Sequence, residues 1–195
     1  MGDIKSAREI AMEKAAKLGE ATGEERLRWH YVPEGERLAV RYLEQDLNLV
    51  VELNRYEEKV REYVIEGARE VLIRNINLPQ SNLAKRNNKR AMEGLKSLKS
   101  DKVAVENVYS RLRQIFAHYL ETGEQQRRQA YEALKAEFET QLKQATQQQG
   151  LLMGVKIDVA KQPRFQEEWR KIQAQLDSQY YKLVDECQQE LMAIP

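Results

Sequence analysis

The sequence predicts an all-α protein: an elongated, coiled-coil-like bundle of three long amphipathic helices, with shorter helices docked on it and an extended connector near residues 150–162. Two observations predict this class. Four prolines and nine glycines in 195 residues leave long stretches without a helix breaker. Apolar residues recur every three or four positions along these stretches, although 32 % of all residues are charged. We therefore expect one folded helical domain over residues 1–195 rather than a disordered chain.

The first 32 residues are expected to form two short docking helices. The first helix begins at Asp3, a good capping residue, and ends at Gly19. Its apolar face consists of Ile4, Ala7, Ala11, Ala15 and Leu18. Thr22 and Glu25 have the spacing of a capping box and start a second helix, which we expect to end before Pro33.

A long helix is predicted from residue 33 to residue 75, because Pro33 suits a first helical turn and only Gly67 interrupts the pattern afterwards. Its apolar stripe advances by steps of four or three positions through Leu49, Leu53, Tyr56, Val60, Tyr63, Gly67 and Val71. Gly67 either permits the close approach of another helix or is a tolerated cost of about 1 kcal/mol.

A basic helix is predicted over residues 82–100, after the turn at Pro79, with Ser81 or Asn82 as its cap. Residues 78–113 hold nine Lys and Arg but three Asp and Glu, a net charge of +6, whereas segments 1–77 and 114–195 carry −3 and −2. Positive charge is therefore concentrated in one part of the chain.

Two further long helices are predicted over residues 101–149 and 163–194. The first follows a cap at Asp101, and its polar stretch near 121–125 indicates an exposed segment or a kink. The connector has an alternating pattern from Val155 to Val159, which favours an extended segment packed over the bundle or, as the alternative, pairing with a second subunit. The last helix has the clearest stripe, formed by Phe165, Trp169, Ile172, Leu176, Tyr180, Leu183, Cys187, Leu191 and Ile194.

No catalytic motif is found in the sequence, so we expect no enzymatic activity, no cofactor and no metal. Neither His30 nor His118 belongs to the Glu-x-x-His pair that a carboxylate-bridged metal centre needs. Cys187 lies on an apolar helix face, where burial suppresses the reactive thiolate. The glycines do not form a phosphate-binding loop followed by Lys-Ser or Lys-Thr.

Two groups of residues remain as candidate binding sites. The first is a patch for an anionic partner on the basic helix, made of Lys85, Arg86, Lys89, Arg90, Lys96 and Lys99. Residues 75–108 contain no aromatic side chain on which a base could stack. The second group is a partner anchor formed by Trp29 and Tyr31, for which the alternative is a role in the core.

The favoured function is that of a non-enzymatic interaction protein: a scaffold, adaptor or assembly subunit that binds itself, as a homo-oligomer, or another protein. Helices this long in so small a chain cover one another poorly. The alternative is a nucleic-acid-associated protein that binds phosphates through the basic helix 82–102. The single cysteine, and the lack of a long apolar run or a signal-peptide pattern, favour the cytoplasm and no membrane partner.

Overall fold

The structure is a computed structural model, and it describes residues 22–45, 47–148 and 158–195. Over these residues the chain forms six α-helices, one 3-10 helix and no strand, which confirms the all-α, bundle-like class. The docking helix expected before Thr22 lies outside the described residues, and so does most of the extended connector. The contacts divide the chain into two compact units, described here separately; the single domain over 1–195 stays a prediction.

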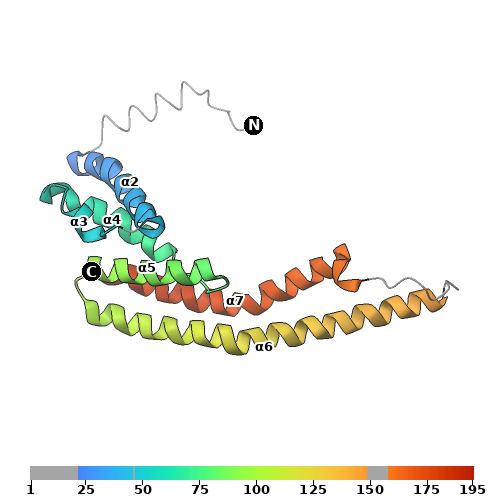
Figure 1. Ribbon diagram of the computed structural model, residues 1–195. Helices are drawn as coiled ribbons and strands as arrows, with labels where there is room; N and C mark the ends of the chain where they lie inside the picture. Colours follow the sequence, from blue (N-terminus) through green and yellow to red (C-terminus); the bar gives the residue numbers. More distant parts are fainter. Residues whose placement is uncertain (1–21, 46, 149–157) are drawn as a thin grey trace, which may run out of the picture. The chain divides into compact units, whose positions relative to one another are not determined.

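The first unit contains α2 (Gly23–Glu44), α3 (Leu49–Leu53), α4 (Glu58–Arg74) and α5 (Asn82–Leu98) from Lys89 onward. Within it α2 packs on α4, and Figure 1 shows the two helices in contact. Their backbones touch at two glycines: a Cβ on Gly35 would lie 1.9 Å from the Val64 carbonyl oxygen, and a Cβ on Gly67 would lie 2.0 Å from the Val32 carbonyl oxygen. Of the two interpretations of Gly67, the close approach of another helix is therefore the one that applies.

The prediction of one continuous helix over residues 33–75 is wrong. Gln45 is extended and ends α2, and the side chain of Asn48 then caps α3 by accepting from the amides of Val50 and Val51. Glu57 again has a non-helical backbone, with φ −59° and ψ 144°, before α4 begins. The breaks allow α4 to pack on α2, so the residues of the predicted stripe belong to α3, to the turn after it and to α4.

The prediction that the second helix ends before Pro33 is also wrong, because Pro33 lies inside α2. Thr22 does form the expected capping box with Glu25. A proline inside a helix normally costs about 3 kcal/mol. Here α2 contacts α4 on both sides of Pro33, through Arg28, which forms an ion pair with Glu66, and through Gly35. Tertiary packing therefore outweighs the local preference to end the helix.

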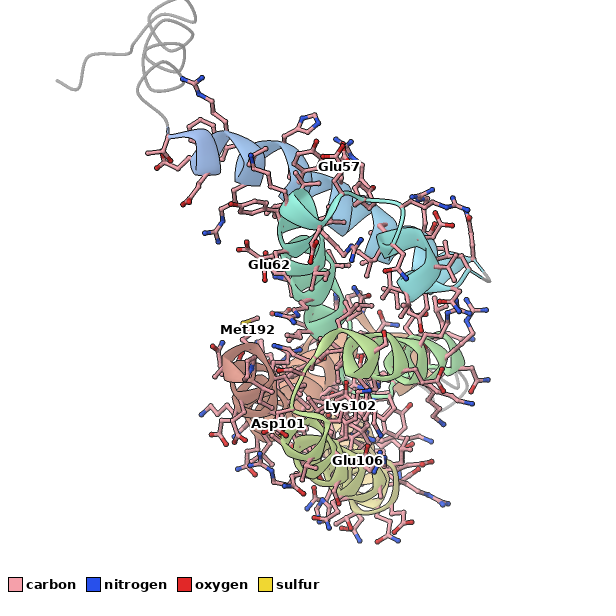
Figure 2. All side chains as sticks on the ribbon, turned by 90° about the vertical axis from the view of Figure 1, so that its left-hand side faces the viewer. Glu57, Glu62, Asp101, Lys102, Glu106 and Met192 are labelled. Atoms are coloured by element: carbon pink, nitrogen blue, oxygen red, sulfur yellow. The ribbon has the colours of Figure 1, made fainter. Side chains whose placement is uncertain are left out.

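The second unit contains residues 77–88, α6 (Lys102–Gln148), the 3-10 helix η1 (Val159–Lys161) and α7 (Pro163–Ala193). Asp101 caps α6, since its carboxylate accepts from the Ala104 amide at 2.9 Å, and Figure 2 shows Asp101 beside Lys102 and Glu106. The helix continues through 121–125 without a break. At the described end of the connector expected to be extended, the chain forms η1.

In this unit α6 and α7 lie side by side and run antiparallel (Figure 1). The contacts show this direction: the later a residue lies in α6, the earlier its partner lies in α7. Arg111 pairs with Glu190, and Tyr131 packs edge-on against Trp169 with ring centroids 5.1 Å apart. The far end of the pair has an apolar cluster built on Leu134, Val159 and Phe165, with Tyr131, Phe138, Leu142, Ala160, Trp169 and Ile172 packed around it.

Candidate interaction sites

The basic helix exposes half of its predicted patch. Lys85, Arg86 and Lys89 lie on α5 with exposed side chains, whereas Lys96 is half-buried. Ser81 caps this helix, its hydroxyl accepting from the Ala84 amide at 3.1 Å. The cap fixes where the helix begins, and the helix period then places these three cations on its exposed side, as expected from the sequence.

Arg90 has a structural role in the first unit. Its guanidinium donates to the Tyr42 carbonyl oxygen at 3.0 and 2.5 Å and to the Gln45 carbonyl oxygen at 2.5 Å, and it lies over the Tyr42 ring, 4.9 Å from the ring centroid. The Tyr42 hydroxyl donates in return to the Arg90 carbonyl oxygen. Arg90 therefore holds α5 against the C-terminal end of α2, whose last carbonyls favour a positive charge.

Lys99 is buried, with 4 % of its surface exposed, directly after the end of α5. Burial, and secondly the neighbouring Arg69 guanidinium, lower the pKa of Lys99 to about 8. Arg69 donates to the Leu98 carbonyl oxygen at 2.6 Å, and burial lowers the pKa of Arg69 too. Arg69 thereby provides a partner for a carbonyl at the negative end of α5, and Lys99 lies just beyond that end.

The two residues of the predicted partner anchor point in different directions. Trp29 is 49 % exposed. Tyr31 is half-buried, and its ring meets the His30 imidazole edge-on with centroids 4.7 Å apart. Trp29 alone is thus available as an anchor in the described part of the chain.

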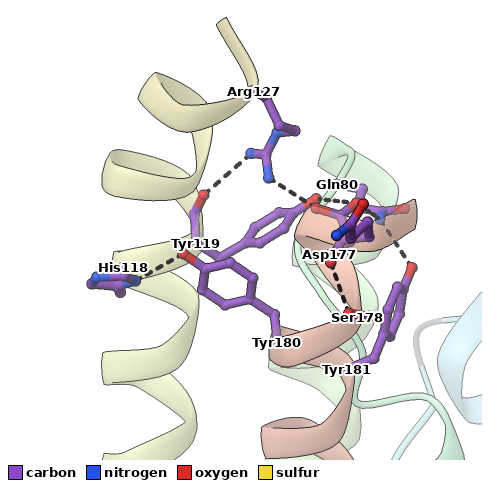
Figure 3. Close-up of polar contacts among 9 residues, drawn as sticks. Gln80, His118, Tyr119, Arg127, Asp177, Ser178, Tyr180 and Tyr181 are labelled. Atoms are coloured by element: carbon purple, nitrogen blue, oxygen red, sulfur yellow. Dashed lines mark hydrogen bonds and ion pairs between the residues drawn. The ribbon is translucent and has the colours of Figure 1, made fainter. Parts of the chain in front are cut away.

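A buried polar cluster in the second unit was missed from the sequence (Figure 3). Asp177, on α7, is 8 % exposed and accepts from Arg127 of α6 at 3.1 Å. Gln80, from the turn before α5, donates at 3.0 Å to the hydroxyl of Tyr181, and it lies 3.4 Å from Asp177. Because burying a lone carboxylate is costly, this arginine and these polar neighbours account for the aspartate.

Tyrosines and a histidine extend the cluster along α6 and α7 (Figure 3). Arg127 also donates to the Tyr119 carbonyl oxygen at 3.2 Å and lies over the Tyr119 ring, 4.2 Å from its centroid. The Tyr180 hydroxyl is 2.9 Å from His118 Nδ1, and it packs against Gly123, where a Cβ would lie 3.2 Å away. The cluster joins α6, α7 and residue 80, so its chemistry is that of a link between helices.

Only part of the predicted stripe of α7 is buried, because Asp177 and Val184 face inward in place of Leu176 and Leu183. The buried positions are Phe165, Asp177, Tyr180, Val184, Cys187 and Leu191. Four predicted positions lie within about 60° of one another on the helix and remain uncovered or half-covered. We call them the outer α7 stripe: Trp169, Ile172 and Leu176, which are half-buried, and Leu183, which is 43 % exposed.

Cysteine and histidine, residue types that often act in catalysis, have these surroundings in the described ranges. Cys187 is buried, and burial raises the pKa of its thiol. His30 lies 3.4 Å from Glu34 on α2, and His118 contacts Tyr180. No group of three or more His, Cys, Asp or Glu side chains that could hold a metal occurs among residues 22–45, 47–148 and 158–195.

The fold and these sites define an all-helical protein whose polar cluster links helices. Residues 50–193 match the family described as "Family of unknown function (DUF6657)", and the chain belongs to this family. The match includes α4 to α7 and the whole polar cluster, while all of α2, with Trp29, precedes it. No curated protein and no solved structure matches the chain. None of the described helices is both long and apolar enough to cross a bilayer.

Proposed function

We propose that this protein is a non-enzymatic helical interaction protein of the cytoplasm, a scaffold or assembly subunit that associates with itself through the outer α7 stripe. The observation that supports the proposal is that the outer α7 stripe is only partly covered in the described part of the chain, although Trp169 and Ile172 also pack on the cluster around Phe165. The most exposed member of the stripe is Leu183, and Trp169, a residue type that often dominates binding energy, lies at its other end.

The spacing of the stripe favours a second copy of the chain over an unrelated partner. Trp169 and Leu183 each lie seven residues from Leu176, one on either side. When two α7 helices pack antiparallel about a two-fold axis at Leu176, Trp169 of one copy meets Leu183 of the other. Such a self-complementary contact is the kind that closed dimers use.

The test is light scattering coupled to size-exclusion chromatography over a series of protein concentrations. We expect the native chain to be a dimer or a larger closed oligomer, and Leu183→Glu to dissociate it because it places a charge in the apolar contact. Lys182→Gln is the control: it also makes the net charge more negative by one, but at an exposed position about 100° away on α7.

A native chain that is monomeric at every concentration would contradict the proposed self-association. An oligomer that resists Leu183→Glu would retain the interaction role and reject this stripe. A mass that falls after nuclease treatment would instead support the alternative of a nucleic-acid-associated protein, for which Lys85, Arg86 and Lys89 are the exposed cations.

A further inference from the structure

The last helix carries two neighbouring stripes, either of which could form its buried face. In the structure α7 buries Asp177 and Val184. The residue before each of them is a leucine: Leu176 is half-buried and Leu183 is 43 % exposed. The two pairs therefore lie about 100° apart around the helix. Three buried residues lie between the pairs and belong to both stripes: Tyr180, Cys187 and Leu191.

A small rotation of α7 would exchange the two stripes. Their mean directions differ by about 40°, so a roll of that size about the helix axis would bury Leu176 and Leu183 and expose Asp177 and Val184. The stripe buried in this way would be wholly apolar, whereas the observed one includes a carboxylate that is 8 % exposed. Because burying an ionised group has a cost that burying leucine has not, apolar burial alone favours the rolled setting.

The contacts of Asp177 exist only in the observed setting (Figure 3). Arg127 donates to it at 3.1 Å, and the Tyr119 hydroxyl and the Gln80 amide each lie 3.4 Å from it. The side chains of α7 extend about 5–6 Å from its axis, so a roll of about 40° moves the carboxylate by about 4 Å. That displacement is more than a hydrogen bond can absorb, and it would leave Arg127, whose side chain is 17 % exposed, without its counter-charge.

We propose that the Arg127–Asp177 pair is a rotational lock, which holds α7 in the setting that buries Asp177 and Val184. In this setting Leu176 and Leu183 stay outside the buried face. The pair thus selects between two packings of one helix, as single buried polar residues do in coiled coils. The lock does not depend on the proposed function. Only its consequence rests on that function: α7 presents Leu183 to a second copy only while the pair is intact.

The test compares the reactivity of single cysteines placed at residues 183 and 184. Cys187→Ala removes the one cysteine of the chain, and Leu183→Cys or Val184→Cys then adds one back. With the pair intact, the thiol at residue 183 should react with an aromatic disulfide reagent about tenfold faster than the thiol at residue 184, because the buried position reacts only after local opening. Arg127→Met removes the guanidinium group and should reverse this order.

A matched control and a concentration series isolate the effect of rotation. Arg113→Met also removes an arginine of α6, but one that pairs with Glu106 at an exposed position, so it should leave the order unchanged. Shielding of residue 183 by a second copy would increase with protein concentration, whereas rotation of α7 does not depend on concentration. A failure of self-association is therefore distinguishable from a failure of the lock.

A double variant decides the case in which Arg127→Met alone unfolds the chain, which circular dichroism would show. Combining it with Asp177→Leu removes both charges and leaves two apolar stripes, so the two thiols should react at similar rates in a folded protein. A thiol at residue 183 that stays about tenfold more reactive in either folded variant would overturn the proposal. Apolar packing would then set the rotation of α7, and the pair would contribute only to stability.

Discussion

Lys99 shows how one buried charge makes stability depend on pH. Its pKa falls from the ordinary 10.5 to about 8 in the folded chain, first through burial and then through Arg69. Between these two values the unfolded chain holds a proton that the folded chain has released. Stability should therefore increase as the pH rises from about 8 to 10.5, and the full cost of burying the charge should be present below pH 8.

We accordingly expect Lys99→Met to be more stable than the native chain at pH 7 and to lose this advantage as the pH approaches 10.5. Denaturant unfolding at a series of pH values measures the difference. Lys59→Met, at an exposed position of α4, controls for the loss of one positive charge. A Lys99→Met variant that follows the native curve at every pH would show that the folded chain solvates this ammonium group fully.

At the residue scale, the positions of the charged residues could be predicted from the sequence, but the side chains that they contact could not. The patch on α5 was predicted from the spacing of its basic residues, and Lys85, Arg86 and Lys89 are exposed as a patch would require. Arg90 and Lys99 could not be separated from them, because their surroundings come from α2 and α4, which are distant in the chain.

Asp177 could have been found by a stricter criterion. Asp177, Tyr180, Val184, Cys187 and Leu191 alternate steps of three and four without a break, which is a regular packing stripe with one charged member. Because only apolar residues were chosen, the predicted stripe contained Leu176 and Leu183 where the buried stripe has Asp177 and Val184. The partner Arg127 carries no such signal, since it lies in a polar stretch of α6.

At the scale of elements, the crossing of α2 and α4 depends on glycines that have no room for a side chain. A methyl group on Gly67 would lie 2.0 Å from a backbone oxygen, which a flexible side-chain rotation cannot relieve. We expect Gly67→Ala to lower the free energy of unfolding of the first unit by about 1–3 kcal/mol or more, because the helices must move apart.

Denaturant unfolding followed by circular dichroism measures this loss. Gly23→Ala is the control, because a Cβ there would meet no atom within 4 Å. Equal stability of the two variants would mean that α2 and α4 separate without cost and that the close crossing contributes nothing to the fold.

The helix boundaries were predictable where capping residues and periodicity agree. The sequence places helices over 82–100, 101–149 and 163–194, and α5, α6 and α7 span Asn82–Leu98, Lys102–Gln148 and Pro163–Ala193. Over 33–75 the apolar period continues across two breaks, so the pattern alone predicted one helix. The missed signal was Asn48, a strong capping residue whose side chain starts α3.

At the scale of the whole molecule, charge is spread unevenly along a chain whose net charge is +1. Only part of the basic segment is exposed, and residues 75–108 lack an aromatic platform for bases. We expect the purified protein to carry no nucleic acid: its ratio of absorbance at 260 to 280 nm should not change after nuclease treatment at low salt.

If nucleic acid does co-purify, it should dissociate as salt is raised, and reversing Lys85 and Lys89 to Glu should abolish the binding. Retention of nucleic acid by that double variant would assign the binding to another surface. Either result would replace self-association as the first function to examine.

The buried Arg127–Asp177 pair also restricts how the length of α6 can change. Tyr119 and Arg127, both on α6, contact the same aspartate of α7. One residue inserted between them would turn the following part of the helix by about 100° and carry Arg127 away from its partner. In alignments of this family, gaps of one residue should therefore be rare between these positions, and length differences should collect in the connections between helices.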